Sequence, residues 1–128
     1  MSVAKNIMVV DDEISIARFL RELLESRGYA VTIEGVSDHA FNIFKQTPQK
    51  FDLLITDQTM PGLTGLQLAE KILSIREDFP IILCTGYSEV ANENKATASG
   101  IKGFLAKPID HSKMLNLIHE LLAENQLG

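Results

Sequence analysis

The stretch LLIT, residues Leu53–Thr56, is a short apolar run that the carboxylate of Asp57 follows directly. A run of this length and composition is typical of a strand that is covered on both faces in a parallel sheet. Two further runs, Ile7–Val10 and Ile81–Cys84, have the same nearly continuous apolar character. Together the three runs predict the central strands of one sheet.

Two other runs complete the pattern. Ala30–Ile33 alternates apolar and polar residues, which indicates a strand at the edge of the sheet, and Gly103–Ala106 is a short run near the end of the chain. Longer segments with apolar residues at helical spacing lie between and after these runs. The predicted helices run from about Ile14 to Arg27, from about Asp38 to Gln46, from Thr64 onward, from about Glu89 to Ser99, and from Asp110 onward.

Residues with strong helix-boundary preferences flank these segments. Gly28 follows the first predicted helix, and Pro48 follows the second, for which Ser37 is the predicted N-cap. The sequence TGLQ, which starts at Thr64, is a capping-box pattern, and Asp110 is the predicted N-cap of the last helix. These signals support the predicted helix boundaries.

Strand and helix therefore alternate five times along the chain. Such βα units need right-handed crossovers, and they predict an α/β fold with a doubly wound, parallel, five-stranded sheet and helices on both faces. The alternation does not give the strand order by itself; the flavodoxin-like order 2-1-3-4-5 is one of the common solutions. The length of 128 residues predicts a single domain over residues 1–128, with a core from about residue 5 to residue 122.

Composition argues against several classes of protein. The formal net charge of −5 argues against direct nucleic-acid binding, which needs a basic surface. No apolar run reaches the roughly 18 residues of a membrane span, and the first residues lack the apolar core of a signal peptide. The single cysteine, Cys84, cannot form an internal disulfide and is expected to be a small buried strand residue. We therefore expect a cytoplasmic protein without membrane contact.

Chemically reactive side chains lie directly after the predicted strands. Asp11 and Asp12 follow the first strand, Asp57 the third, Thr85 the fourth and Lys107 the fifth. Ligands bind open α/β sheets at the carboxyl ends of the strands, so these groups are expected to converge. Crowded carboxylates with no His or Cys beside them favour a hard cation such as Mg²⁺. An aspartate can be a nucleophile, and a metal, an ammonium and a hydroxyl suit phosphoryl transfer to it.

This set of residues resembles the response-regulator receiver family of two-component signalling. The resemblance rests on the two aspartates after the first strand, Asp57, Thr85 and the pair Lys107-Pro108, and it extends from about residue 5 to residue 122. The segments DQTMPGLTG (57–65) and ILCTGYSE (82–89) are particularly similar to receivers attached to hybrid sensor histidine kinases. The resemblance implies a phosphoacceptor domain that assists its own phosphorylation and dephosphorylation, rather than an enzyme.

The resemblance also implies a donor and a metal site. Asp57 would accept a phosphoryl group from a phosphohistidine of a histidine kinase or a histidine phosphotransfer protein. Mg²⁺ or Mn²⁺ would be held by Asp12, Asp57 and the backbone carbonyl of Thr59, with Asp11 nearby or linked through water. The output surface would comprise the fourth helix, the fifth strand and the fifth helix, and dimerisation through the fourth and fifth helices is left open.

Further roles follow from the same resemblance. Lys107 would pair with the phosphoryl oxygens, Thr85 would turn toward the new phosphate, and Phe104 would be the switch aromatic that turns inward with it. The peptide bond after Lys107 would be cis. Thr59 and Tyr87 would tune the lifetime of the phosphoryl group; Tyr87 is hypothesised to limit water access, and an ordinary surface tyrosine is the alternative.

Simpler interpretations stand beside these. Asp12 is also a favoured N-cap, and Asp57 beside a Met-Pro-Gly turn could be an ordinary turn residue. A phosphatase of the haloacid dehalogenase type would need a second aspartate where Thr59 stands, and a flavodoxin would need a phosphate-cradling first loop instead of an acidic one. A degenerate receiver that binds partners without phosphorylation is left open. Three histidines are expected to be solvated helix residues rather than phosphohistidines: His39, His111 and His119.

Overall fold

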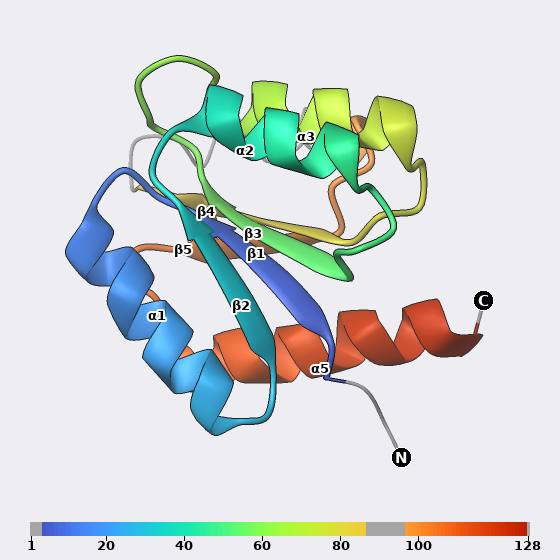
Figure 1. Ribbon diagram of the computed structural model, residues 1–128. Helices are drawn as coiled ribbons and strands as arrows, with labels where there is room; N and C mark the ends of the chain where they lie inside the picture. The colour runs from blue at the N-terminus through green and yellow to red at the C-terminus, as the bar shows by residue number, and fades with distance from the viewer. Residues whose placement is uncertain (1–3, 87–96, 128) are drawn as a thin grey trace.

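Strands and helices alternate along the chain in the computed structural model, which describes residues 4–86 and 97–127 (Figure 1). The strands are β1 (Asn6–Val10), β2 (Ala30–Glu34), β3 (Leu53–Asp57), β4 (Ile81–Thr85) and β5 (Gly103–Ala106). The helices in the described part of the chain are α1 (Ile14–Ser26), α2 (Ser37–Gln46), α3 (Gly65–Ile75) and α5 (His111–Leu127). Each predicted strand is present, with its bounds within one residue of the prediction.

The five strands form one parallel sheet in the order β2-β1-β3-β4-β5, which confirms the flavodoxin-like order. β3 and β4 are buried along their whole length, as their continuous apolar sequences predict. β2 lies at the edge, and all five of its residues are partly exposed, in agreement with its alternating sequence. β2 and β3 lie on opposite sides of β1, so the order in which strands are added to the sheet reverses after β2 and makes β1 and β3 neighbours.

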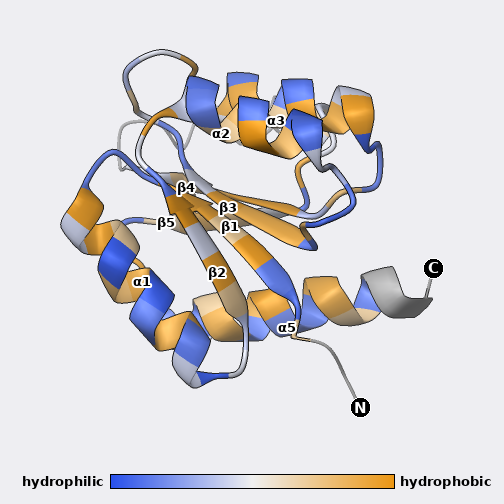
Figure 2. Cartoon of the chain, viewed as in Figure 1, coloured by the Kyte–Doolittle hydropathy of each residue, from blue (hydrophilic) through white to orange (hydrophobic). Residues whose placement is uncertain are grey.

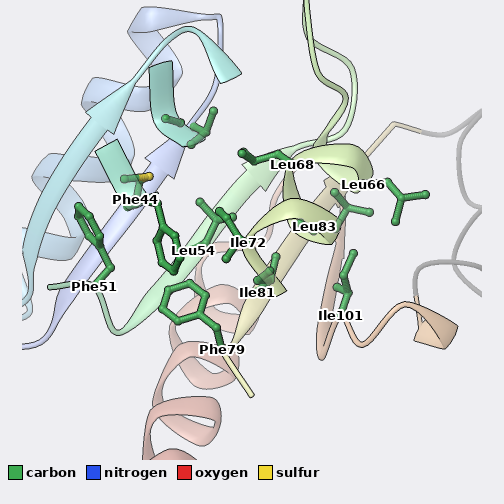
Figure 3. Close-up of a cluster of buried hydrophobic side chains, with 14 of the residues drawn as sticks. Phe44, Phe51, Leu54, Leu66, Leu68, Ile72, Phe79, Ile81, Leu83 and Ile101 are labelled. Atoms are coloured by element: carbon green, nitrogen blue, oxygen red, sulfur yellow. The ribbon is translucent and has the colours of Figure 1, made fainter. Parts of the chain in front are cut away.

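Helices cover both faces of the sheet: α1 and α5 lie on one face, and α2 and α3 lie on the other (Figure 1). Figure 2 shows apolar residues concentrated in the strands and on the helix surfaces that face them. The core under α2 and α3 contains three fully buried phenylalanines, with the Phe44 ring 5.0 Å from Phe79 and 6.2 Å from Phe51 (Figure 3). None of the helices within residues 4–86 and 97–127 combines the length and hydropathy that a membrane span requires.

Most of the predicted helix boundaries are confirmed. The Thr64 side chain accepts from the Gln67 N–H at 3.1 Å, and the Gln67 side chain accepts from the Thr64 N–H at 2.9 Å, so the capping box is complete. Asp110 Oδ1 accepts from the Lys113 N–H at 3.1 Å. α1 ends at Ser26 with Arg27 as its C-cap, and the positive φ of 92° at Gly28 lets the chain leave the helix without a side-chain clash.

The prediction that Ser37 caps α2 is wrong. Val36 occupies the N-cap position without a side-chain hydrogen bond, and Ser37 is the first residue of the helix. The Ser37 side chain is fully buried, and its hydroxyl donates to the carbonyl of Pro61 at 3.3 Å. The hydroxyl therefore holds the connection between β3 and α3 against α2 instead of capping its own helix.

Two predictions concern residues that are not described. Tyr87 lies outside the described residues, and so does most of the predicted fourth helix, from about Glu89 to Ser99. The predicted lifetime-tuning role of Tyr87 and the predicted output surface on that helix therefore remain predictions.

Candidate functional site

Three carboxylates meet at the carboxyl edge of the sheet. Asp11 and Asp12 follow β1 and Asp57 ends β3, and these two strands are neighbours. One carboxylate oxygen from each of the three residues lies within 4.8 Å of the others. Asp11 and Asp57 are 5% and 6% exposed, whereas Asp12 is exposed to solvent. Carboxylates of this kind, open to water on one side, fit the preference of Mg²⁺ for oxygen ligands and retained waters.

The ammonium of Lys107 faces this acidic cluster. Lys107 follows β5, and its Nζ lies 2.6 Å from Oδ1 of Asp57. Burial alone lowers the pKa of Lys107, but its hydrogen bond to Asp57 and the charges of Asp57 and Asp11 outweigh burial and raise the pKa above its ordinary value. Lys107 is therefore a permanent cation at neutral pH, as the sequence predicts for a group that binds phosphoryl oxygens.

The charge on Asp11 is less well compensated. Burial raises the pKa of Asp11; the Glu13 N–H, 2.9 Å from Oδ1, opposes this rise, and the nearby charge of Asp57 adds to it. Because the folded state disfavours the ionised form of Asp11, a bound cation would relieve an existing electrostatic cost. The same hydrogen bond orders the start of α1, since Glu13 is the N-cap of that helix and its own side chain makes no cap bond.

The remaining predicted site residues come from β4 and β5. Thr85 ends β4, is 8% exposed, and accepts a backbone hydrogen bond from the Lys107 N–H at 2.9 Å. The Lys107–Pro108 peptide bond is cis, as the resemblance implies. Phe104, on β5, is partly buried against the core under α2 and α3. Thr59 is exposed in the connection between β3 and α3.

Comparisons with known proteins identify the family. The family model of the response regulator receiver domain matches residues 7–119. This chain belongs to the response regulator receiver domain family. It is thus a receiver of two-component signalling, and its relatives are regulators rather than catalysts.

Individual relatives support the assignment of this receiver. It is 32% identical over 92% of its length to CpdR, a response regulator receiver protein of Brucella abortus, and covers 97% of that protein. It is 31% identical over 96% of its length to the transcriptional regulatory protein ZraR of Klebsiella oxytoca, and spans 27% of that longer protein. These relatives are response regulators, so they give no support to the predicted likeness to hybrid sensor histidine kinases.

A solved structure agrees with the fold of the receiver. The crystal structure of a response regulator receiver domain protein from Clostridium thermocellum matches it with a TM-score of 0.93 at 28% identity, covering 96% of this chain and 98% of that one. The doubly wound fold with five parallel strands is therefore that of known receiver domains.

Two residues of the site were not predicted from the sequence. Gly65, the first residue of α3, lies so close to β3 that a Cβ there would overlap the backbone carbonyl of Asp57 and come 2.7 Å from a methyl group of Leu83. Gln58 donates its N–H to Asp57 Oδ1 at 3.0 Å and accepts from the Leu66 N–H at 2.8 Å. The capping box marked Gly65 as a helix start, but no sequence pattern signalled its contact with Asp57.

An apolar groove adjoins the acidic site of the receiver. It lies between α1 and the connection from β5 to α5, and it includes Lys107 at one end. Phe19, on α1, is 48% exposed, and its ring centroid lies 5.0 Å from that of His111. The other lining residues are Ser15, Ile16, Leu20, Pro108 and Ile109. His39, His111 and His119 are all exposed, as predicted, and none of them belongs to the acidic cluster.

Cys84 is buried next to the site, and its thiol is unreactive. It is 3% exposed on β4, where it pairs with Asp57 of β3. Burial raises the pKa of its thiol to about 12, and the charge of Asp57 contributes. The thiol is therefore protonated at neutral pH and is a packing residue, as predicted.

Proposed function

We propose that Asp57 is the phosphoacceptor of this receiver and that the donor is a phosphohistidine on a histidine kinase or a histidine phosphotransfer protein. The observation that carries the proposal is the position of Asp57. Its carboxylate ends the central strand β3, lies 2.6 Å from the Lys107 ammonium and shares its surroundings with Asp11 and Asp12. No other aspartate in the described part of the chain combines an ammonium partner with two neighbouring carboxylates.

Asp57 and the residues around it would have different roles in phosphoryl transfer. An oxygen of the Asp57 carboxylate attacks phosphorus, the bond from phosphorus to the histidine nitrogen breaks, and its electron pair stays on the imidazole. Asp11, Asp12, Asp57 and the backbone carbonyl of Thr59 would hold Mg²⁺ or Mn²⁺. When bound, the metal neutralises negative charge on the transferred group. Lys107 supplies a second positive charge to a phosphoryl oxygen.

We propose that the signal leaves through β5 and its neighbours. Thr85 and Lys107 are linked through their backbones, and Phe104 lies on β5, the strand that Lys107 follows. Phosphorylation adds about −1.5 to −2 charge, so the Thr85 hydroxyl and the Lys107 ammonium have a new group to bind. Movement of Thr85 would free space for Phe104 to turn inward, which biases the surface formed by the fourth helix, β5 and α5.

The donor protein would dock on the apolar groove between α1 and the connection from β5 to α5. This groove shares Lys107 with the acidic site, so a protein seated on it would bring its phosphohistidine to Asp57. The exposed ring of Phe19 lines the groove and offers a contact that a helical donor surface can bury. A cytoplasmic location agrees with the free thiol of Cys84.

The direct test is the intact mass of the protein after incubation with acetyl phosphate, with and without Mg²⁺. The wild type is expected to gain one phosphoryl group only with Mg²⁺, and Asp57→Asn is expected to gain none. Asp78→Asn, which removes an exposed carboxylate that precedes β4, at the opposite end of that strand from Thr85, is the matched control and should behave as the wild type. No gain by the wild type, together with no binding of beryllofluoride and Mg²⁺, would replace the proposal with a degenerate receiver that acts without phosphorylation.

A further inference from the structure

The residue after Asp57 links β3 to the first turn of α3. The backbone carbonyl of Gln58 accepts from the Gly65 N–H at 3.0 Å, and its side-chain Oε1 accepts from the Leu66 N–H at 2.8 Å. The first N–H groups of a helix have no partner within the helix, so they need acceptors from outside. Gln58 supplies two such acceptors from the end of a neighbouring strand.

The capping box serves different groups of the same turn. The Thr64 side chain accepts from the Gln67 N–H, and the Gln67 side chain accepts from the Thr64 N–H. These two bonds leave the Gly65 and Leu66 N–H groups to Gln58. Two separate sets of hydrogen bonds thus satisfy the first N–H groups of α3. Only the set made by Gln58 involves a residue that also contacts Asp57.

Gln58 also orients the carboxylate of Asp57. Its backbone N–H donates to Asp57 Oδ1 at 3.0 Å and to the carbonyl of Cys84 at 2.9 Å. Asp57 Oδ1 is also the oxygen that lies 2.6 Å from Lys107 Nζ. The Gln58 peptide therefore sits between β4, the carboxylate and α3. Contact between Gly65 and the carbonyl of Asp57 leaves this peptide little room to shift.

We propose that Gln58 is a positioning residue for phosphoryl transfer: its side-chain carbonyl fastens its own peptide to α3, and the N–H of that peptide holds Asp57 Oδ1 in its orientation. The inference rests on the proposed role of Asp57 as phosphoacceptor. Transfer to a carboxylate depends on the alignment of the attacking oxygen, so loss of the side-chain acceptor lowers the rate even where the fold survives.

The test compares Gln58→Met with Gln67→Met. Both substitutions keep the side-chain length and remove one amide acceptor from the first turn of α3, but only Gln58 contacts Asp57. We expect Gln58→Met to lower the rate of phosphorylation by acetyl phosphate, at saturating Mg²⁺, by about tenfold. Gln67→Met is expected to lower the melting temperature comparably and to keep the rate within about twofold of the wild type. Gln58→Glu, which keeps an acceptor at a helix N-terminus, is expected to recover part of the rate.

Each outcome decides the proposal. Equal rates for the Gln58→Met and Gln67→Met variants would mean that Gln58 only caps α3, and would overturn it. If Gln58→Met does not fold, Gln58→Asn replaces it, because its shorter side chain cannot make the same bond to Leu66. We expect the same loss of rate, and a rate equal to that of Gln67→Met would overturn the proposal. A wild type that takes up no phosphoryl group and binds no beryllofluoride with Mg²⁺ would overturn the phosphoacceptor role itself, whereas uptake that is equal in wild type and Gln58→Met overturns this inference alone.

Discussion

The Lys107 ammonium and the Asp57 carboxylate form the shortest ion pair of the described residues, at 2.6 Å between Nζ and Oδ1. Lys107 follows β5, the last strand of the chain, and Asp57 ends β3 in the middle of the sheet, so the pair exists only when the sheet order is complete. Asp11 adds a further buried carboxylate beside the pair. We therefore expect the pair to contribute to stability, and under the proposed function its ammonium would also bind an incoming phosphoryl group.

Loss of the ammonium should destabilise the metal-free protein. In Lys107→Met, three neighbouring carboxylates keep their charges with no cation among them, so we expect the free energy of unfolding at pH 7 to fall by about 1 to 3 kcal/mol. Urea denaturation in the presence of a chelator measures this change, and saturating Mg²⁺ should restore part of it. Lys102→Met, which removes an exposed lysine whose ammonium contacts only a backbone carbonyl among the described residues, is the control. An equal loss in both variants would contradict the prediction.

Removal of the Asp11 charge should have the opposite effect without metal. Because burial raises the pKa of Asp11 above its ordinary value of 3.8, the folded state binds this proton more tightly than the unfolded chain does. The contribution of Asp11 to stability is therefore fully present below pH 3.8 and is lost as the pH rises through the folded-state pKa. At pH 7, Asp11→Asn should raise the melting temperature of the metal-free protein by about 2 to 5 °C.

The same substitution should weaken metal binding. Asp11→Asn removes one of the three carboxylates, so we expect Mg²⁺ affinity to fall about tenfold or more. Thermal melts over a Mg²⁺ titration report both effects: the wild type gains stability with Mg²⁺, and the variant gains little. Glu77→Gln, which neutralises an exposed carboxylate, should match the wild type in both measurements. A variant that is less stable than the wild type without metal would refute the electrostatic account.

The convergence of the site residues could be predicted because each of them directly follows or ends a predicted strand. Asp11, Asp57, Thr85 and Lys107 each stand at the end of an apolar run, and parallel strands bring such ends to one edge. Each position depends only on local signals and on one general rule of topology. The order of the strands within the sheet was left open by the alternation, with 2-1-3-4-5 as one of the common solutions.

Contacts between distant segments could not be predicted in this way. The Ser37 hydroxyl was expected to cap α2, but it bonds to Pro61, which lies 24 residues away along the chain. The link from Gln58 to Leu66 likewise depends on the distance between β3 and α3, which the capping-box pattern does not contain. Such contacts are set by the packing of α2 and α3 on the sheet, and a helical or strand period carries no information about them.

Gly65 should tolerate no larger side chain. In Gly65→Ala the added methyl group overlaps the carbonyl of Asp57, so α3 must move away from β3. Alanine is the better helix former by about 1 kcal/mol, yet we expect a net loss of roughly 1 to 3 kcal/mol in the free energy of unfolding. Gly35→Ala is the control, because its added methyl group would make only an ordinary contact of 3.8 Å with a backbone oxygen. Chemical denaturation of the two variants checks the expected difference, and equal stability would show that α3 shifts at no cost.

Phe19 should matter to a protein donor and not to a small one. Phe19 is 48% exposed in the groove that leads to Lys107 and lies apart from the carboxylates, so Phe19→Ser leaves the reacting groups in place. We expect Phe19→Ser to slow transfer from a histidine-phosphorylated phosphotransfer protein by about tenfold, because it removes an aromatic contact that the docked donor would bury. Phosphorylation by acetyl phosphate should stay within about twofold of the wild type.

Ile75→Ser provides the matched control for this experiment. Ile75 is 40% exposed on α3, which lies on the opposite face of the sheet from α1, so its loss should affect neither donor (Figure 1). Because both substitutions replace an exposed apolar side chain with serine, a general effect of surface polarity would appear in both. A Phe19→Ser variant that is slow with acetyl phosphate as well would assign Phe19 to the integrity of the site. A Phe19→Ser variant with normal rates for both donors would contradict docking on this groove. If the groove contributes to docking, loss of its exposed aromatic ring must slow transfer from the protein donor.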